Sequence, residues 1–499
     1  MDNILLLRPN HTEDKKDTYI SLPLGLGYIG SSLLKEGYNV LIIDLALENV
    51  NYNNLTERIK KFNPKVIGIS ALSFQYIHVK KLVNYLKSIT TCKIILGGFL
   101  ATYNYNIVLE KILIDICILG EGELTIIKLL KNLDNLSNVS GIAYKENNQI
   151  IATSSNELIK DLDSIPFPAY HLFDIDKYSI FSMSDMYIPH TYLKKKKIHK
   201  QLTLIGTRGC PFACNFCSKM NYIYRPRSLK SVIEEIKYLK NTYDIDIFGF
   251  HDELLFSNFK QIQDFCNEIK KIKVNWYGDI RINLVNYNTL KMLKESGCLT
   301  ISFGVESGSF KILENMNKKI SPIDIERTIK DCLKLDLIPG MGLILGYPGE
   351  NADTINETIN LFKRVGYPAL KFRYITPYPG SKLYNECLKN KTIENEEEYL
   401  ESIGDGTGPY RFRHNFTKFT NNQLYSLLPY VVKKILNNYL IYLLKHPLIL
   451  FKYLFRQDFM NPIYYYYHSW KNPTNYDKAA KSKKSIKEIE NLFKKSGNK

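Results

Sequence analysis

The stretch Thr207-Arg208-Gly209-Cys210-Pro211-Phe212-Ala213-Cys214-Asn215-Phe216-Cys217 follows an expected strand and precedes a helix that begins near Leu229. Thiolates are the soft ligands that iron–sulfur clusters require. Three cysteines in one short loop can wrap one corner of a cubane cluster, and without a fourth ligand nearby one iron would stay open to a chelating molecule. A structural zinc site usually takes four ligands in paired Cys-x-x-Cys modules, and the sequence has no second pair. Cys210, Cys214 and Cys217 therefore predict a [4Fe–4S] cluster with an open iron site.

The composition is that of an ordinary globular protein. The chain has 499 residues, of which 45% are hydrophobic and 23% charged, and this length calls for two domains. No secretory signal is visible, since the apolar run Ile4–Leu7 lacks a basic segment before it, so we expect a cytoplasmic protein whose cysteines serve a metal site rather than disulfides. We expect the six cysteines outside the loop to be core residues: Cys92, Cys117, Cys266, Cys298, Cys332 and Cys387.

The net charge of +17 comes from lysines scattered along the whole chain. A nucleic-acid-binding protein should gather Lys and Arg on one face, so a small-molecule substrate is the favoured interpretation and a nucleic acid the less favoured one. The basic run Lys194–Lys197 is expected to be a solvated loop. Leu436–Phe455 is apolar but is interrupted at Lys445-His446-Pro447, which favours a packed helical cap over a membrane span and leaves membrane-surface contact as a minor alternative. The end of the chain, Lys478–Lys499, is expected to fray.

Residues 1–150 alternate short apolar strands with helical patterns, which predicts a Rossmann-like parallel sheet. Small residues follow the strands, and in such sheets ligands bind beyond the carboxyl strand ends. A ligand cleft is favoured over tight turns alone, because glycines recur after successive strands. The expected strands are Ile4–Leu7, Val40–Asp44, Val66–Ser70, Lys93–Leu96 and Ile114–Leu119, with helices beginning near Leu26, Leu55, Tyr76 and Glu123.

A hairpin is expected at 141–155, followed by a linker over 151–200. Residues 201–400 then show a second strand–helix alternation that predicts a partial (β/α)6 barrel, with its active site at the carboxyl strand ends. A C-terminal helical region is expected over 401–499. The expected barrel strands are Leu202–Gly206, Ile245–Phe250, Val274–Tyr277, Thr300–Gly304, Met341–Leu345 and Ala369–Ile375.

The cysteine loop, C-x3-C-x2-C with Phe216 before the last cysteine, resembles the signature of the radical S-adenosylmethionine (SAM) superfamily. Later motifs extend the resemblance, and what it implies is a set of SAM contacts. His251-Asp252-Glu253 stands where the family has a "GGE"-like turn that holds the SAM amino group. Glu306 and Ser307 resemble the ribose and carboxylate contacts. Ile344 and Gly346 resemble the adenine-side motif, although its acidic residue, Glu350, is displaced by one place.

The first 150 residues are similar to the cobalamin-binding domain of one large radical SAM class. The matching pieces imply that cobalamin is bound by Gly25, Gly27, Ser70, Gly97, Gly98, Gly120 and Glu121. The D-x-H-x-x-G motif of some cobalamin proteins is absent, and Leu100 stands where some relatives carry a histidine. We therefore expect cobalamin to be bound base-off, without a protein histidine on cobalt. The alternative is a Rossmann-like domain that has lost this cofactor or binds another.

The resemblance implies an enzyme that uses a [4Fe–4S] cluster, SAM and cobalamin, similar to the class B radical SAM methyltransferases. In this family an external one-electron reductant of the flavodoxin or ferredoxin type drives the reductive cleavage of SAM. The favoured outcome is methylation of an unactivated carbon in a small molecule or natural product. The alternatives are a radical cyclase, oxidoreductase or rearrangement enzyme without methyl transfer, and a sensor without turnover. A tRNA methylthiotransferase is disfavoured, because Cys92 and Cys117 are isolated.

Overall fold

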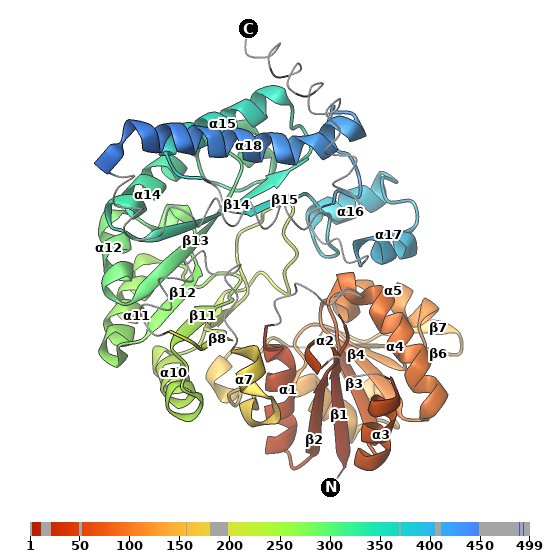
Figure 1. Cartoon of the computed structure of the whole chain (residues 1–499). Coiled ribbons are helices and arrows are strands. Elements are labelled where there is room, and N and C mark those ends of the chain that lie inside the picture. Colours follow the sequence, from red (N-terminus) through yellow and green to blue (C-terminus); the bar gives the residue numbers. More distant parts are fainter. Residues whose placement is uncertain are drawn as a thin grey trace.

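The computed structural model describes residues 2–10, 21–48, 52–155, 157–179, 198–368, 371–404 and 411–448, together with Ile489 and Phe493. Two α/β units stand side by side, and the C-terminal helices reach over both (Figure 1). This confirms the expected order of a Rossmann-like domain and a partial barrel.

The first unit is a seven-stranded sheet in the order β2-β1-β3-β4-β5-β6-β7. Its strands β1 to β5 pair in parallel, and β6 and β7 form the expected antiparallel hairpin. The strands are β1 Asn3–Arg8, β2 Asn39–Asp44, β3 Val66–Ser70, β4 Lys93–Gly97, β5 Ile116–Ile118, β6 Ile142–Glu146 and β7 Gln149–Ala152. The helices are α1 Leu24–Lys35, α2 Leu45–Glu48, α3 Tyr52–Phe62, α4 Tyr76–Ile89, α5 Phe99–Lys111 and α6 Glu123–Lys131, with short 3₁₀ turns at η1 Ser73–Gln75 and η2 Leu136–Asn138.

Helix α5 is an element that the sequence pattern did not reveal. It begins directly after Gly98, and at Asn104 its backbone leaves helical geometry with φ of −126°. The polar and apolar residues of this segment do not separate onto two faces, because the helix is covered both by the sheet and by the C-terminal segment.

The second unit is a half-barrel of six parallel strands in the order β15-β14-β13-β12-β11-β8. Helices cover its outer face (Figure 1), as expected for right-handed crossovers. The strands are β8 Gln201–Leu204, β11 Ile247–Phe250, β12 Asn275–Asp279, β13 Cys298–Glu306, β14 Ile338–Leu345 and β15 Lys371–Tyr374. The helices are α10 Leu229–Tyr243, α11 Phe259–Ile272, α12 Tyr287–Glu295, α13 Phe310–Asn315, α14 Pro322–Lys334 and α15 Ala352–Val365, with a 3₁₀ turn at η5 Ile282–Leu284.

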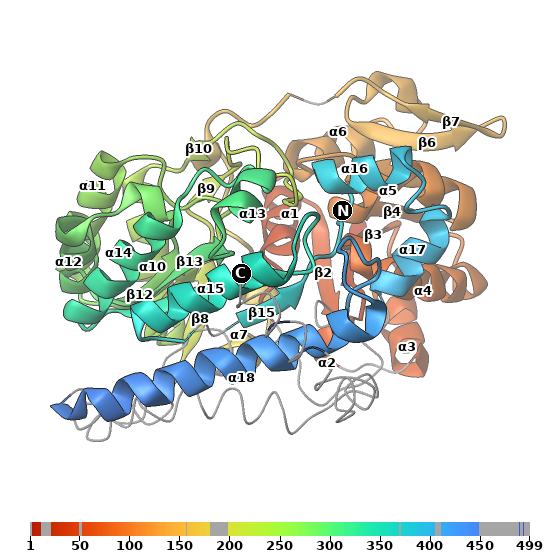
Figure 2. The same cartoon turned by 90° about the horizontal axis from the view of Figure 1, so that it is seen from above.

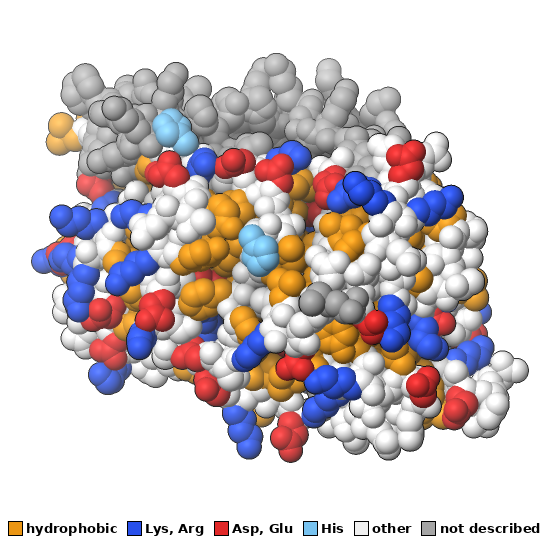
Figure 3. Space-filling model, turned by 90° about the horizontal axis from the view of Figure 1, so that it is seen from below, with side chains coloured by type: hydrophobic (Ala, Val, Ile, Leu, Met, Phe, Trp, Pro, Cys, Tyr) orange, Lys and Arg blue, Asp and Glu red, His pale blue; other side chains and the backbone are white. Residues whose placement is uncertain are grey.

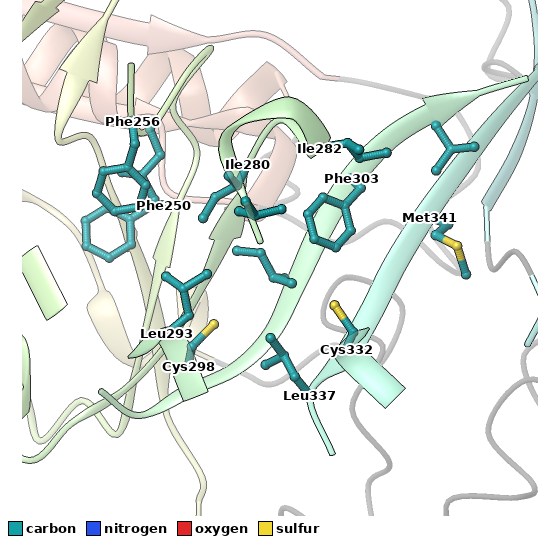
Figure 4. Packing of buried hydrophobic residues seen from close by; sticks show 14 of the residues in the cluster. Phe250, Phe256, Ile280, Ile282, Leu293, Cys298, Phe303, Cys332, Leu337 and Met341 are labelled. Atoms are coloured by element: carbon teal, nitrogen blue, oxygen red, sulfur yellow. The ribbon is translucent and has the colours of Figure 1, made fainter. Parts of the chain in front are cut away.

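The core of the half-barrel lies between its sheet and these helices. Alternate strand residues such as Phe250, Phe303 and Met341 point to the helix side and are fully buried (Figure 4). Cys298 and Cys332 fill this layer like other small apolar residues. Five of the six single cysteines are buried as expected, and the sixth, Cys92, is half-buried directly before β4.

The inner face of the half-barrel carries smaller and more polar residues. Its floor, near the amino ends of the strands, is a separate apolar cluster of Ile198, Ile247, Tyr277 and Leu299. Above this floor the residues that face inward include Ser302, Gly304 and Gly342, which lie beside one another in the parallel register or on the same strand. The lumen therefore opens toward the carboxyl strand ends, where barrel active sites form.

The linker packs against both units. Its short helical turns are η3 Leu162–Ser164, η4 Tyr170–Leu172 and α7 Ile175–Tyr178. The Tyr178 hydroxyl donates to Asp44, which also pairs with Arg8, and the Tyr170 hydroxyl donates to Glu235 on α10 at 2.6 Å. These buried contacts tie the first unit and the barrel to the same segment.

The C-terminal helices are α16 Lys382–Lys389, α17 Glu396–Ile403 and α18 Asn421–Lys445. Helix α17 contacts α4 of the first unit, while α18 runs along α15 of the barrel (Figure 2). Helix α18 ends at Lys445, where the sequence predicted an interruption, and no helix in the described ranges is long and apolar enough to cross a membrane. The segment Lys194–Lys197 and nearly all of Lys478–Lys499 lie outside the described residues.

Basic and acidic side chains are interspersed on the face of the molecule drawn in Figure 3. On this face no large area carries basic side chains alone. On this face the basic side chains are thus spread out, as the scattered lysines predicted.

Candidate functional site

The cysteine loop is closed at its base by a two-stranded ribbon. Strand β9 (Thr207–Arg208) pairs antiparallel with β10 (Arg225–Pro226), so the chain leaves and re-enters the barrel at the same point. Gly209 follows with φ of +80°, and a Cβ there would collide with the backbone of Ile223. The residue before Cys210 must therefore be glycine for the two sides of the loop to lie this close together.

The three cysteines of the loop are free thiols. Cys210 is buried, and Cys214 and Cys217 are half-buried. The pKa of the Cys217 thiol is raised to about 11, mainly by burial; Lys219 and Lys318 act to lower it, while Cys214 and Cys210 act to raise it, so the three thiols lie near one another. The described residues hold no group of three His, Cys, Asp or Glu side chains close enough for a single metal ion. A cubane cluster needs no such convergence, because each cysteine binds a different iron.

Neighbouring segments hold the loop in place through its backbone. The Asn215 amide donates to the Met316 carbonyl at 3.0 Å, and the Leu383 amide donates to the Asn215 carbonyl at 2.9 Å. Phe216 packs edge-on against Tyr347 at 6.5 Å between ring centroids. The loop is thus fixed from α13, α16 and the turn after β14, which pre-positions the thiols.

An arginine that the sequence did not single out lies against this loop. Arg281, after β12, stacks over the Phe212 ring at 3.6 Å from the centroid. Its Nη1 lies 4.0 Å from the Cys214 sulfur, and its Nη2 donates to the Lys318 carbonyl at 2.6 Å. Among the described residues no ion pair includes Arg281, so its positive charge acts mainly on the loop.

The residues after β11 lie next to the cysteine loop. Asp252 is buried and accepts a hydrogen bond from the Thr207 amide, while its other oxygen has no partner among the described residues. Burial raises the pKa of Asp252 to about 7. Glu253 accepts from the Met220 amide at 3.1 Å, and the exposed His251 ring packs edge-on against Tyr277 on the lumen side. All three predicted residues therefore lie beside the loop, and Asp252 and Glu253 accept hydrogen bonds from the segments at its two ends.

Glu306 occupies a bulge at the end of β13. Its φ is +62°, which an L-residue adopts only under constraint, and its carboxylate pairs with Lys318 at 2.8 Å. Ser307 turns the other way: its side chain is buried and accepts from the Ser309 amide at 3.1 Å. The structure thus leaves Glu306 at the lumen edge and uses the Ser307 side chain within the turn.

The turn after β14 is held from inside. Gly346 has φ of +83°, and its amide donates to the Glu350 carboxyl at 2.6 Å. Burial raises the pKa of Glu350 to about 8, so this group is largely protonated at neutral pH. Ile344 lies on the inner face just before the turn. The displaced acidic residue therefore positions the turn rather than facing the lumen.

Small residues line the carboxyl edge of the first sheet. A Cβ at Gly25 would meet nothing, and one at Gly97 would meet only a carbonyl at 4.0 Å, so this edge is open. Gly98 has φ of +87°, and a Cβ there would lie 2.6 Å from the Ala71 oxygen. Ser70 ends β3 at the same edge.

Gly27 and Gly120, which were predicted for this edge, contact other parts of the structure. The same is true of Leu100, the position where some relatives carry a histidine. Gly27 lies inside α1 and allows close packing against Pro168 of the linker. Leu100 is fully buried in the core of the first unit. Gly120 has φ of +77°, and its amide donates to Thr102 at 3.0 Å, so it shapes the turn before α6.

Glu121 joins the two units instead of facing the open edge. Both of its oxygens accept from Arg225, at 2.7 and 2.9 Å, and Arg208 lies 3.3 Å away. Arg208 also pairs with Glu123 at 2.5 Å. All four side chains are at most 17% exposed. The ribbon at the base of the cysteine loop is therefore clamped to the first unit by a buried ion network, here called the interface network.

The first turn of α5 makes a second junction. Thr102, which accepts from the Gly120 amide, lies with its hydroxyl 3.7 Å from the Met220 sulfur. The Tyr103 hydroxyl donates to the Lys219 carbonyl. Lys219 and Met220 directly follow the cysteine loop, so the open edge of the first sheet and the thiols adjoin.

Comparison with known proteins explains this arrangement. The family model described as "Radical SAM superfamily" matches residues 204–362, and the "B12 binding domain" model matches residues 16–130. An uncharacterized methyltransferase of Pyrococcus horikoshii is 31% identical over 74% of this chain and 79% of its own length. The chain belongs to the radical SAM superfamily. The B12-binding domain places it in the cobalamin-binding group that the sequence resemblance predicted.

Other relatives of this radical SAM protein have different names. Cytidylyl-2-hydroxyethylphosphonate methyltransferase of Streptomyces wedmorensis is 27% identical over 79% of this chain and 83% of its own length. Anaerobic magnesium-protoporphyrin IX monomethyl ester cyclase of Rubrivivax gelatinosus is 25% identical over 89% of this chain and 81% of its own length. The relatives thus include both methyltransferases and a cyclase.

Two solved structures share the fold of this radical SAM protein. The methyltransferase TsrM of Kitasatospora setae has a TM-score of 0.63 at 15% identity, covering 78% of this chain and 75% of that chain. The cobalamin-dependent enzyme OxsB has a TM-score of 0.62 at 20% identity, covering 82% of this chain and 57% of that chain. These likenesses confirm the architecture of a Rossmann-like unit followed by a half-barrel.

In this radical SAM protein, sequence reasoning missed the residues that connect the two units. Arg208 and Arg225 flank the cysteine loop and were not distinguished from other basic residues. Tyr103 lies on the unpredicted helix α5. The one signal available was the pair of glutamates in Gly120-Glu121-Gly122-Glu123, which required basic partners once buried.

Proposed function

We propose that the protein is a cobalamin-dependent radical SAM methyltransferase that acts on an unactivated carbon of a small molecule. The observation that carries the proposal is the junction at α5. Thr102 binds both the Gly120 turn of the B12-binding domain and Met220, which lies three residues after Cys217. The candidate cobalamin edge and the candidate cluster loop thus share one wall.

The residues present fit the groups that the family implies. Cys210, Cys214 and Cys217 would hold a [4Fe–4S] cluster, since all three are free thiols in one anchored loop. The open positions at Gly25 and Gly97 would admit cobalamin. Small residues at such strand ends let a large planar ligand approach the sheet.

SAM would be held at the carboxyl ends of the barrel strands. We propose that Phe216, His251, Glu253, Glu306 and Ile344 contact it there, while Asp252, Ser307 and Gly346 shape the turns that carry them. The unpartnered oxygen of Asp252 marks a polar position close to the cysteine loop.

The cluster and cobalamin, when bound, would supply the electron that cleaves SAM and the methyl group that is transferred. The protein's own residues orient the reacting groups and exclude water. The apolar floor of Ile198, Ile247, Tyr277 and Leu299 closes the far end of the lumen. The interface network fixes the cysteine loop relative to the B12-binding domain.

We propose an acidic one-electron donor of the flavodoxin or ferredoxin type as partner. The tip of the cysteine loop reaches the surface at Pro211 and Ala213, which are exposed. Lys311 and Lys319 are exposed on the neighbouring segment, and Asn317 of that segment donates to the Ala213 carbonyl at 2.6 Å. Basic residues beside the shortest path to the cluster would attract such a donor.

We place the protein in the cytoplasm. All nine of its cysteines are free, and a reducing compartment keeps thiols in this state.

The test uses protein purified and reconstituted without oxygen. The holoenzyme is incubated with dithionite, SAM that carries a deuterated methyl group, and a small-molecule extract of the source cells. We expect 5′-deoxyadenosine, S-adenosylhomocysteine and a product that contains the deuterated methyl group. Cys214→Ala, the matched control, should give none of the three.

The same experiment separates the alternative activity. One relative is named as a cyclase, and a cyclisation or rearrangement would produce 5′-deoxyadenosine with no label in any product. That result would overturn methyl transfer and leave the superfamily assignment intact.

A further inference from the structure

Lys219, two residues after Cys217, carries a buried positive charge. The residue is only 3% exposed, and lysines are almost never buried to this degree unless they are paired. Its ammonium donates to the Cys210 carbonyl at 3.4 Å, and the Tyr222 ring lies over it, with its centroid 4.7 Å from Nζ. In the parts of the chain that the structure describes, no ion pair includes Lys219. Burial of a charge is costly without an anionic partner, so this ammonium calls for one.

The main chain of Lys219 is held by the B12-binding domain. The Tyr103 hydroxyl on α5 donates to the Lys219 carbonyl. The Tyr103 ring fits there because residue 380 is glycine, since a Cβ at Gly380 would lie 2.5 Å from the ring. The next residue, Met220, has its sulfur 3.7 Å from the Thr102 hydroxyl. The first turn of α5 thus sets the position of this cation together with the cysteine loop.

Two acidic groups lie within electrostatic range of the Lys219 ammonium. Burial raises the pKa of the Cys217 thiol, and Lys219 is the charged group that lowers this pKa most. Burial also raises the pKa of Glu253, and Lys219 is one of the groups that lower it. Glu253 already accepts a hydrogen bond from the Met220 amide at 3.1 Å, and it forms no ion pair with Lys219 in the described ranges. The Cys217 sulfur is therefore the acidic group that Lys219 serves best.

The chemistry of the loop supplies the missing anion. A [4Fe–4S] cluster bound by three thiolates carries a net negative charge, and reduction by one electron makes that charge larger. The net charge, the hydrogen bonds and the solvent exposure around a cluster set its reduction potential. Because Lys219 is buried, water and salt screen its charge much less than that of a surface lysine. The cation is thus uncompensated beside neutral thiols and compensated beside thiolates that hold iron.

We propose that Lys219 is the counter-charge of the cluster, and that Tyr103 of the B12-binding domain holds it in place. The ammonium stabilises the thiolates that bind iron and favours the uptake of an electron from the flavodoxin- or ferredoxin-type donor. Tyr103 acts through Lys219 and is a positioning residue. This inference rests on the proposed function, since it assigns a residue to the same cluster site.

The test is an EPR-monitored redox titration, without oxygen, of the holoenzyme loaded with cluster and cobalamin. Lys219→Met removes the charge, Lys219→Arg keeps it, and Tyr103→Phe removes only the hydroxyl group. Lys230→Met is the matched control, because the Lys230 side chain is 84% exposed on the outer helix α10. Iron content and SAM affinity, the latter by calorimetry, are measured for every variant.

We expect Lys219→Met to lower the midpoint potential, with at least about tenfold less reduced cluster relative to oxidised cluster at a fixed potential. For one electron this corresponds to a shift of about 59 mV. Lys219→Arg should lie close to the wild type, because the positive charge remains, and Tyr103→Phe should lie between the wild type and Lys219→Met. Lys230→Met should match the wild type, and SAM affinity should be equal in all variants.

An unchanged potential in Lys219→Met, or an equal shift in Lys219→Arg, would overturn the inference. A loss of SAM affinity without a shift in potential would also overturn it, because Lys219 would then serve the turn at Glu253. A potential in Tyr103→Phe equal to that of the wild type would overturn the role of the B12-binding domain.

Iron content decides the case in which Lys219→Met does not hold a cluster. Recovery of iron in Lys219→Arg would support the role of the charge, and no recovery would overturn it. None of these measurements depends on methyl transfer. A protein whose potential shifts as expected but that transfers no methyl group would refute the proposed function alone.

Discussion

Replacing Glu121 by glutamine should loosen the cysteine loop from the B12-binding domain. The carboxylate accepts two hydrogen bonds from Arg225 and lies 3.3 Å from Arg208, with only 6% of its side chain exposed. Removing one partner of a buried ion pair costs about 3–5 kcal/mol, because the remaining charges stay buried. Glutamine keeps one acceptor oxygen, so we expect about 3 kcal/mol.

Amide hydrogen exchange followed by mass spectrometry measures this loss directly. About 3 kcal/mol corresponds to roughly 100-fold more frequent opening, and we expect it at the Ile159 amide, which donates to Glu121, and at the β9–β10 ribbon. Glu36→Gln, which removes an exposed ion pair with Lys131, is the matched control and should leave exchange unchanged. Equal protection of the ribbon in Glu121→Gln and wild type would refute the role of the network.

The network should also respond to acid in a defined direction. Burial raises the pKa of Glu121, but Arg225 and Arg208 outweigh it and hold the pKa below the ordinary value of 4.5. The stabilisation that the network gives to the folded state is therefore complete above pH 4.5, and it is lost as the pH falls through the lowered pKa of Glu121. In Glu121→Gln this acid-dependent loss of protection should be absent.

Three further perturbations test other parts of the site. Arg281→Gln should make the cluster harder to reduce, because the positive charge of Arg281 lies 4.0 Å from the Cys214 sulfur. With the added electron shared over the cluster, this charge should stabilise the reduced form by about 1–2 kcal/mol. The midpoint potential in an EPR-monitored redox titration should therefore fall by roughly 40–90 mV in the variant. An unchanged midpoint potential would contradict this. Gly98→Ala should lower the free energy of unfolding by more than about 2 kcal/mol and reduce the amount of bound cobalamin. The reason is that φ of Gly98 is +87° and a Cβ there would lie 2.6 Å from the Ala71 oxygen. Glu350→Gln should gain stability over the wild type as the pH rises from 4.5 toward 8, since in this range the unfolded wild-type chain ionises Glu350 while the folded chain keeps the carboxyl protonated; urea titrations that show a constant difference between the two would refute this.

Much of the fold was predictable because its signals are local. Val66–Ser70 is a buried strand with the expected limits, and α4 begins at Tyr76 as expected. Helix α5 was missed, because its residues are covered on several sides and show no helical period of polar and apolar positions.

The candidate site was predictable where the chemistry is carried by residue type and spacing. The cysteine loop required only its own residues. Glu121 was interpreted as a cobalamin contact from its place in a glycine-rich turn, but its partner Arg225 lies in the other unit, and sequence alone does not reveal such pairings. Arg281 was missed for the same reason, since its contact with Cys214 depends on how the loop folds back over the barrel.

Metal and corrinoid analysis of protein purified without oxygen tests the central claim most directly. The account predicts about four irons with matching sulfide and about one cobalt, as cobalamin, per chain. A variant with Cys210, Cys214 and Cys217 all changed to alanine should lose the iron and keep the cobalamin. A wild-type protein that binds cobalamin but holds no cluster after reconstitution, or a cluster but no cobalamin, would contradict the account.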